Sequence, residues 1–407
     1  MNDLATSFFI AYKSVMRGSR SMLALMIFIL TLSFLNMMFI SGVLSGLWET
    51  ELQLVRDLAT SDVTISPQQE PQIKQYITNQ DVLRAQVQTI PGVVATARHY
   101  QLAGSLTYDK DNSGQLKSVS GTIIGIDPSA ENKVLTTNTL LMNGQWLSDT
   151  DTDQVVLSSA LAGGYGTPTF SDLGGVKVGD KLQVTYSNGY IRTYTVKGIY
   201  NDMMGSFQTF ITAKEAESVL GVYNDASQIL VKTDPSRMNA TAYQERIHEM
   251  FPSLKLQNYN DLLGYVASFQ QALMLISNIV GAISILVAAI TIFVLIYVNA
   301  VNKKRQIGIL KAIGIKQKII VNAYVMQSLF YTVCGLAVGA FAVFGLLNPL
   351  LIAHPIPIVV DLMYLSLSYT PLGVGTAILC FLIAGYLAGR LPAKMVAKKN
   401  IMEAIWG

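Results

Sequence analysis

Residues that could catalyse a reaction or hold a metal are present in this sequence, but their spacing suits neither role. A phosphate-binding loop has the pattern GxxxxGK[ST], and the nearest segment, Gly174–Lys181, lacks the Gly-Lys-Ser/Thr ending that grips phosphates. The histidines His99, His248 and His354 are far apart and lack metal-ligand spacing. No Gly-x-Ser-x-Gly segment or Cys–His constellation occurs. We therefore expect no catalytic residue, no metal site and no cofactor bound by this chain.

The side chains with the most evident chemistry are cations, and they gather in the segment 301–322. Within it, Asn302–Asn322 reads NKKRQIGILKAIGIKQKIIVN. Apolar residues recur there at helical spacing, namely Ile307, Leu310, Ile313 and Ile320. A short amphipathic helix of this kind either lies on anionic lipid or docks into a groove of a partner protein. Periodicity alone leaves both alternatives open.

The basic segment lies between long uncharged stretches of apolar residues, of which the chain has four. Hydrophobic residues make up 51% of the chain and charged residues 14%, against about a quarter charged in soluble proteins. Each run is near or above the roughly 20 apolar residues that cross a bilayer as a helix, and a charge at mid-bilayer would cost about 2.5–3.5 kcal/mol. The four expected transmembrane helices are 21–47, 272–300, 323–347 and 371–389.

The distribution of Lys and Arg orients these helices. Basic residues flank the first span on its N-terminal side (Lys13, Arg17 and Arg20) and fill the segments 301–322 and 390–407, whereas 348–370 holds none. Because cytoplasmic loops carry the excess of Lys and Arg, we expect both termini in the cytoplasm. Residues 48–265 and the loop 348–370 then lie outside.

The segment 1–20 is expected to form a cytoplasmic amphipathic helix at the inner membrane surface. Leu4, Phe8, Ala11 and Val15 recur at helical spacing there. Beyond the first span, helical patterns continue outward in Trp48–Ala59 and return in 260–271, so the outer domain would hang on two helical stalks. Trp48 and Tyr265 sit where interfacial aromatic residues usually lie.

The outer domain, 48–265, alternates helix and strand patterns and is expected to be an α+β domain of two lobes. Residues 79–90, 213–221 and 235–250 resemble helices, and 100–126 resembles a hairpin with its turn at 109–114. Lys181–Tyr186 and Ile191–Ile199 form a second pair around an Asn-Gly turn. The strand-rich middle piece, about 125–210, would be inserted into a lobe built from the flanking pieces.

Two segments resemble signatures of ABC-transporter permeases of the FtsX/MacB superfamily. Arg305–Gly314, RQIGILKAIG, is similar to the pattern R-E-I-G-I-L-(R/K)-A-(I/L)-G, and Pro392–Trp406 is similar to the closing pattern with P-A and E-A-(L/I). Landmarks of the outer domain follow in the family's order, namely 90–93, 125–128, 144–146, 155–162 and 178–180. Gly46–Leu52 is similar to the segment after the first span of lipoprotein-releasing (LolC/LolE-like) permeases.

Departures from the family pattern concern detailed contacts. Gln306 stands where the family usually has Glu, and Asn400-Ile401 stand where Asp-Pro is usual. The tight turn at Ser187–Tyr190 stands about where one of the two lipoprotein-releasing permeases has a hook-like insertion that recruits a carrier. No such insertion is present in this sequence, which counts against carrier recruitment by this subunit.

The resemblance implies site residues in two sets. The first set is a coupling helix that docks on an ATPase, with Lys303, Lys304, Arg305, Ile307, Gly308, Leu310, Lys311, Ala312 and Gly314. The second set is the closing motif, with Pro392, Glu403 and Ala404. In addition, the spacings Gly42-x-x-x-Gly46 and Gly335-x-x-x-Gly339 offer close-packing faces between helices.

The resemblance also implies partners and a location. These are a separate ABC ATPase subunit that holds ATP and Mg²⁺, a second permease subunit in a homo- or heterodimer, and an outer adaptor or carrier. Membrane lipid is a further partner, and no nucleic acid is expected. The chain would be a multi-pass protein of the bacterial cytoplasmic (inner) membrane.

Two functions fit this layout. In the first, ATP hydrolysis in the partner moves the outer domain (mechanotransmission) to release or export a lipoprotein or another hydrophobic substrate. In the alternative, the same motion signals to an outer partner such as a cell-wall hydrolase. A stand-alone receptor would leave the basic 303–320 segment unexplained.

Overall fold

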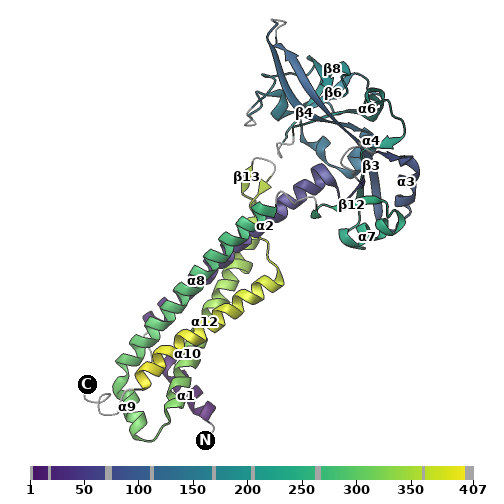
Figure 1. Ribbon diagram of the computed structural model, residues 1–407. Helices are drawn as coiled ribbons and strands as arrows, with labels where there is room; N and C mark the ends of the chain where they lie inside the picture. The colour runs from purple at the N-terminus through teal and green to yellow at the C-terminus, as the bar shows by residue number, and fades with distance from the viewer. Residues whose placement is uncertain are drawn as a thin grey trace. The chain divides into compact units, whose positions relative to one another are not determined.

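The computed structural model divides the chain into two compact units, shown in Figure 1. One comprises residues 1–50 and 266–407, and the other comprises residues 51–265. The structure describes residues 3–16, 20–68, 76–110, 114–166, 171–202, 207–261, 267–359 and 363–398.

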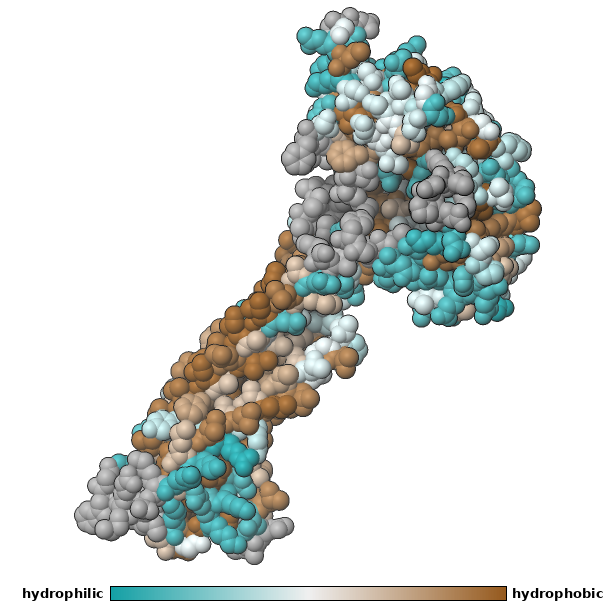
Figure 2. Space-filling model, viewed as in Figure 1, coloured by the Kyte–Doolittle hydropathy of each residue, from teal (hydrophilic) through white to brown (hydrophobic). Residues whose placement is uncertain are grey.

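The first unit is helical. Its elements in the described residues are α1 (Asp3–Met16), α2 (Arg20–Val55), α8 (Ala267–Asn302), α9 (Lys304–Ala312), α10 (Gln317–Ala340), the π-helix η5 (Phe341–Leu347), α11 (Asn348–Ala353), the short strands β13 (Pro357–Val359) and β14 (Met363–Tyr364), and α12 (Pro371–Ala397). Four helical stretches are long and apolar enough to cross a membrane: Arg20–Thr60, Gln270–Asn302, Gln317–Ala353 and Pro371–Ala397. Each contains one of the four expected spans, and Figure 2 shows hydrophobic residues over them.

Side chains from all four of these helical stretches form the core of the helical unit, and α10 contributes Tyr331. Leu30 and Phe34 of α2, Ile296 of α8 and Phe381 of α12 are almost fully buried. The rings of Phe34 and Phe381 meet edge to face with centroids 5.4 Å apart, an arrangement that aromatic pairs favour. The helices therefore pack on one another as well as presenting apolar side chains outward.

The glycine pairs have different neighbours. A Cβ atom added at Gly335 would lie 2.6 Å from Leu30 Cβ, and one at Gly339 would lie 2.7 Å from Phe34 Cδ1, so α10 lies close against α2. Gly42 and Gly46 do not face another helix. They face the segment before α12, where Tyr369 and the Ser366 carbonyl approach them.

A third pair, Gly385 and Gly389 of α12, was not singled out in the sequence although it has the same spacing. Added Cβ atoms there would clash with Thr332 and Ser328 of α10. Ser328 and Thr332 are buried, and their hydroxyls donate to the carbonyls of Val325 and Ser328. The glycines thus allow α12 to lie directly on a polar, internally hydrogen-bonded strip of α10.

The second unit is an α+β domain, as expected. Its main sheet runs β12-β1-β11-β3-β4-β9-β6-β8-β5, and β7 pairs with both β3 and β8. The strands are β1 (Val63–Pro67), β3 (Val93–Asp109), β4 (Leu116–Ile126), β5 (Leu141–Gly144), β6 (Gln154–Ser158), β7 (Lys181–Tyr186), β8 (Ile191–Tyr200), β9 (Gln208–Thr212), β11 (Gln228–Thr233) and β12 (Leu254–Asn258). A separate pair joins β2 (Ile77–Thr78) and β10 (Asp225–Ala226).

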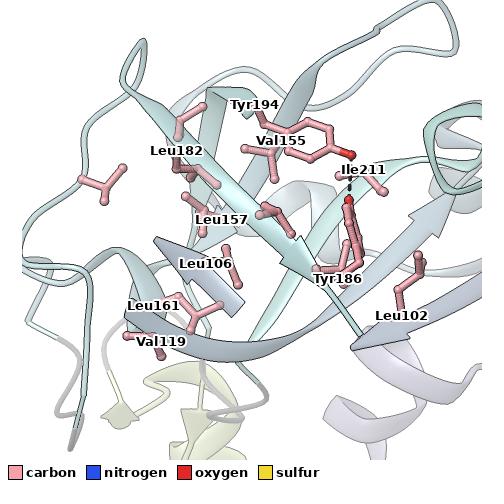
Figure 3. Close-up of a cluster of buried hydrophobic side chains, with 14 of the residues drawn as sticks. Leu102, Leu106, Val119, Val155, Leu157, Leu161, Leu182, Tyr186, Tyr194 and Ile211 are labelled. Carbon is pink, nitrogen blue, oxygen red and sulfur yellow. Dashed lines mark hydrogen bonds between the residues drawn. The ribbon is translucent and has the colours of Figure 1, made fainter. Parts of the chain in front are cut away.

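Six of these strands close on themselves and form the first lobe. The ring runs β3-β4-β9-β6-β8-β7 and back to β3, so its interior can be filled from all sides. Figure 3 shows this interior, where Leu106, Leu157 and Tyr194 are fully buried. The hydroxyls of Tyr186 and Tyr194 are 2.6 Å apart and hydrogen-bonded, which satisfies two polar groups that would otherwise be buried unpaired.

The second lobe is built from parts of the two flanking pieces, whereas the hairpin 100–126 belongs to the first lobe, which therefore extends beyond the expected 125–210. Strands β12, β1 and β11 continue into the N-terminal part of β3, and α3 (Gln80–Gln88) and α7 (Ala240–Met250) contribute Val87 and Ile247 to a core with Val63 and Ile229. The strand β3 joins the lobes, because its first residues pair with β11 and its later residues pair with β4 and β7.

Several expected boundaries differ. The first arm of the expected hairpin begins at Val93 and not at residue 100, because pairing with β11 passes directly into pairing with β4 at His99. Helix α7 begins at Ala240, five residues later than expected, because the Asn239 side chain accepts a hydrogen bond from the Ala242 N–H and caps it. Helices α4 (Pro128–Val134), α5 (Ser159–Ala162) and α6 (Ala213–Leu220) complete the lobes.

The segment that follows α2 is held within the second unit by a dense set of hydrogen bonds. Helix α2 passes into a π-helix, η1 (Arg56–Thr60). The backbone carbonyl of Asp57 accepts from the Thr136 N–H at 2.9 Å, and its carboxylate lies 3.1 Å from Lys232 Nζ. Immediately before β1, the buried Asp62 carboxylate accepts a hydrogen bond from the Thr233 N–H at 2.7 Å. The stalk that the sequence predicted after the first span is thus fixed to the outer unit; much of the second stalk, with Tyr265, lies outside the described residues.

The charge of Asp57 contributes to this attachment. Burial alone would raise the pKa of Asp57, but hydrogen bonds from Arg56 and Lys232 outweigh burial and lower its pKa. A carboxylate whose folded pKa is lowered adds stability above its unfolded pKa, and that stability is lost as the pH falls through the folded value.

The substitution Asp57→Asn is therefore expected to lower the stability of the outer unit at pH 7 by about 1 kcal/mol, the upper part of the range for half-exposed ion pairs. The difference from the parent chain should shrink at pH values below the ordinary pKa of 3.8. Thermal melts of both chains at several pH values would measure it. Equal melting temperatures at pH 7 would contradict the role assigned to this ion pair.

Candidate functional site

The basic helix α9 lies at one end of the helical unit, together with α1, the start of α10 and the end of α12. Ser7 of α1 donates a hydrogen bond to the Ile319 carbonyl of α10 at 3.1 Å. Lys303, just before α9, donates to Ser14 Oγ of α1 at 2.8 Å. Lys311 of α9 donates to the Ala397 carbonyl of α12 at 2.9 Å. These contacts assemble four chain segments into one surface.

The C-terminus of α9 is closed by a glycine turn. Gly314 has φ +89°, its N–H donates to the Lys311 carbonyl, and the Ile315 N–H donates to the Leu310 carbonyl. This pair of bonds is a Schellman motif, in which glycine takes the left-handed position at no steric cost. The glycine of the family signature therefore ends α9 and lets the chain turn into α10.

One face of α9 is buried in the helical unit. Ile307 is 4% exposed and Gly308 is buried, and Leu310 packs on the same cluster. That cluster also contains Ile320 of α10 and Val396 of α12. The expected docking residues Ile307, Gly308 and Leu310 thus lie on the side of α9 that packs against its own chain.

Two of the expected docking lysines also make contacts within the chain. Lys303 is half-buried and reaches α1, and burial lowers its pKa. Lys311 reaches the last turn of α12, where a cation interacts favourably with the helix dipole. We infer that these two side chains hold α9 in place.

The opposite face of α9 is exposed and partly apolar. Ile309 is 50% exposed and Ile313 is 72% exposed. They stand four residues apart, so they are neighbours on the helix surface. Arg305, Ala312 and Gly314 are exposed beside them. Ile309 was missed in the sequence analysis, although its spacing from Ile313 was a readable signal.

The surface around α9 is strongly basic. In the described parts of 3–16, 303–318 and 390–398, the one carboxylate is Asp3, which lies 3.9 Å from Lys316 Nζ. The same parts hold ten basic side chains, Lys13, Lys303, Lys304, Arg305, Lys311, Lys316, Lys318, Arg390, Lys394 and Lys398. Figure 2 shows hydrophilic residues gathered at this end of the helical unit. A surface with an excess of positive charge attracts negatively charged partners.

The closing motif is described only in part. Pro392 is buried inside α12, whereas Glu403 and Ala404 lie outside the described residues, as does Arg17 at the other end of the chain. Among the residues that the structure describes, no three His, Cys, Asp or Glu side chains gather as a metal site would need.

Two family models match the chain over consecutive regions. The MacB-like periplasmic core domain matches residues 23–249, and the FtsX-like permease C-terminal domain matches residues 278–401. The first match alone spans more than half of the chain, and the second includes α9, α10 and α12.

Named relatives cover parts of the chain. A protein of Staphylococcus haemolyticus named "Putative hemin transport system permease protein HrtB" is 29% identical over 232 residues, which cover 57% of this chain and 60% of that protein. The macrolide export ATP-binding/permease protein MacB of Chromobacterium violaceum is 28% identical over 148 residues, covering 36% of this chain and 22% of that protein. The chain thus spans 60% or less of these relatives. They do not show the expected closeness to lipoprotein-releasing permeases.

Solved outer domains resemble part of the chain distantly. The periplasmic region of MacB from Actinobacillus actinomycetemcomitans aligns with a TM-score of 0.37 and 15% identity, covering 52% of this chain and 95% of that one. The extracellular domain of the ABC-type transporter YknZ from Gram-positive bacteria aligns with a TM-score of 0.34 and 14% identity, covering 48% of this chain and 98% of that one.

Proposed function

This chain belongs to the FtsX/MacB superfamily of ABC-transporter permeases, and from that premise we propose that it couples a separate ATPase to motion of its outer unit. The observation that carries the proposal is the two-sided burial of α9. One side, with Ile307, packs into the helical unit, and the other side exposes Ile309 and Ile313. An exposed isoleucine pair on a basic helix is suited to fill a pocket of a partner protein.

The packing of α9 supports a route for force into the membrane helices. A force on the exposed side of α9 would act through Ile307 on the hydrophobic cluster that α9 forms with α10 and α12. Helix α10 in turn contacts α2 closely at Gly335 and Gly339. Packed elements of this kind transmit small displacements because cores resist compression.

The route continues along α2, a single helix from Arg20 to Val55. Its end is anchored to the outer unit through Asp57 and Asp62. We propose that this continuity carries motion from the inner surface to the outer unit, so that the substrate need not pass through a pore between the helices.

For the substrate, the relatives' names point to apolar cargo. They refer to macrolides and hemin, both of which carry extensive apolar surface. We propose a hydrophobic or amphipathic substrate, a class that includes lipoproteins. A signalling role would use the same helix and the same anchor, and nothing in the described residues favours it over transport.

The proposed orientation places α9 and both termini in the cytoplasm of a bacterial cell, in its inner membrane. The basic character of the surface around α9 supports it. With the native Cys334 and Cys380 replaced, we expect a cysteine introduced at Lys110 to react with an impermeant maleimide from the outer side. A cysteine introduced at Lys316 should react only after permeabilisation, and the opposite pattern would contradict the orientation.

Docking through α9 is tested by giving its exposed side a charge. Because hot-spot residues cost about 2 kcal/mol or more when lost, Ile309→Asp with Ile313→Asp should weaken binding of the chain's ABC ATPase by about thirtyfold. Co-purification and titration of the ATPase against the reconstituted chain would measure this.

A matched control introduces the same carboxylate at an exposed position far from α9 in the sequence. Tyr223→Asp also puts a carboxylate in place of a side chain that is 85% exposed, in the outer unit, and should leave ATPase binding unchanged. Full ATPase binding by the α9 double variant would overturn the docking assignment.

A further inference from the structure

A cavity of about 340 Å³ lies between α1, α9 and α10, at the lower end of the range for small-molecule sites. Its inner wall is buried and mainly apolar, with Ile307, Ile320 and Ala323, and the buried Gln327 also lines it. Its rim carries Lys13 and Lys303. The cavity thus combines an apolar interior with two cations.

Neither of these cations has a carboxylate partner in the described part of the chain. Lys303 is half-buried and its Nζ donates to Ser14 Oγ at 2.8 Å, whereas Lys13 is exposed and its Nζ lies 5.6 Å from the centroid of the Phe9 ring. Partly burying a cation without a counter-ion is unfavourable. An anion held between the two amino groups would offset that cost.

The cavity adjoins the end of a candidate membrane span. Lys303 directly follows Asn302, the last residue of the span α8. Beside it, α1 exposes large apolar side chains on one side, with Leu4 63%, Phe8 65% and Tyr12 56% exposed. A helix that buries one side in protein and exposes apolar side chains on the other is suited to the membrane interface.

We propose that this cavity binds one anionic phospholipid, with its phosphate between Lys13 and Lys303 and the start of an acyl chain against Ile307, Ile320 and Tyr324. The apolar wall favours a lipid over a free phosphate, because a soluble anion would leave that wall unfilled. The exposed pair Ile309 and Ile313 does not line the cavity, so lipid and ATPase would occupy different sides of α9. The proposal requires membrane insertion but does not rest on ATPase docking.

Bound lipid would brace α1 against α9. Lys303, just before α9, already donates a hydrogen bond to Ser14 of α1. A phosphate that both lysines contact would add a further connection through charge-assisted hydrogen bonds. The position of the coupling helix would then depend on the anionic lipid content of the membrane.

Native mass spectrometry of the full-length chain in detergent tests this, with phosphatidylglycerol and phosphatidylcholine supplied at equal concentration. We expect one phosphatidylglycerol retained in preference to phosphatidylcholine. Lys13→Gln with Lys303→Gln should weaken that binding by about thirtyfold, because each lysine near an anionic headgroup contributes about fivefold.

The matched control is Lys318→Gln with Lys394→Gln, which removes the same charge from two exposed lysines that do not line the cavity. It should change phosphatidylglycerol binding by less than about threefold. Ala323→Leu, which fills the cavity and leaves the charge unchanged, should weaken binding as well, and it keeps the test valid if the lysine variant fails to fold.

Three results would overturn the proposal. Equal weakening by both lysine pairs would indicate a general charge effect. Equal retention of the two lipids would exclude recognition of the anionic headgroup. Displacement of the lipid by glycerol phosphate at the concentration at which phosphatidylglycerol itself competes would show that the cavity recognises a phosphate alone.

Discussion

The arrangement of the helical unit depends on the packing of one short helix on two sides. Helix α9 buries Ile307 among side chains of α10 and α12, and Lys303 and Lys311 tie it to α1 and to the end of α12. Because that side is fixed, Ile309 and Ile313 are held outward at the same end of the unit. A helix without these contacts could rotate and bury Ile309 and Ile313. The pair stays exposed because the side of α9 with Ile307 is already packed against α10 and α12.

The second dependence is the continuity of α2. Helix α10 lies on α2 at two glycines, where any side chain would force the helices apart. At its far end, the chain of α2 continues into η1, where Asp57 binds Lys232 and the Thr136 N–H. A helix transmits displacement along its axis only if it is held at two separate points. Contacts with α10 hold α2 inside the helical unit, and the contacts of Asp57 hold the segment after α2 inside the outer unit.

Much of this could be predicted from the sequence, and the remainder has physical reasons. The four spans follow from the cost of charge in hydrocarbon, and the two-lobed outer domain follows from alternating patterns. The inward direction of Ile307, Gly308 and Leu310 could not be predicted, because an amphipathic pattern identifies an apolar face without saying whether its own chain or a partner covers it. Likewise, Lys311 and Asp57 are charged residues of the kind usually found at the surface. The sequence did not reveal their contacts, because Lys311 binds Ala397 and Asp57 binds Lys232, and both partners are distant in sequence. Glycine spacing suggested Gly335 and Gly339, but the same spacing at Gly42 and Gly46 meets a loop segment instead.

The main proposal is that an ATPase docked on α9 moves the outer unit relative to the membrane helices when it hydrolyses ATP. It is tested most directly by single-molecule energy transfer between dyes at Tyr223→Cys and Ile352→Cys, two side chains that are 85% and 74% exposed, in a chain that lacks its native cysteines. With the ATPase bound, the account predicts that the transfer efficiency changes when ATP is added, and that Ile309→Asp with Ile313→Asp abolishes the change. A transfer efficiency that stays constant while the intact complex hydrolyses ATP and moves substrate would contradict the account.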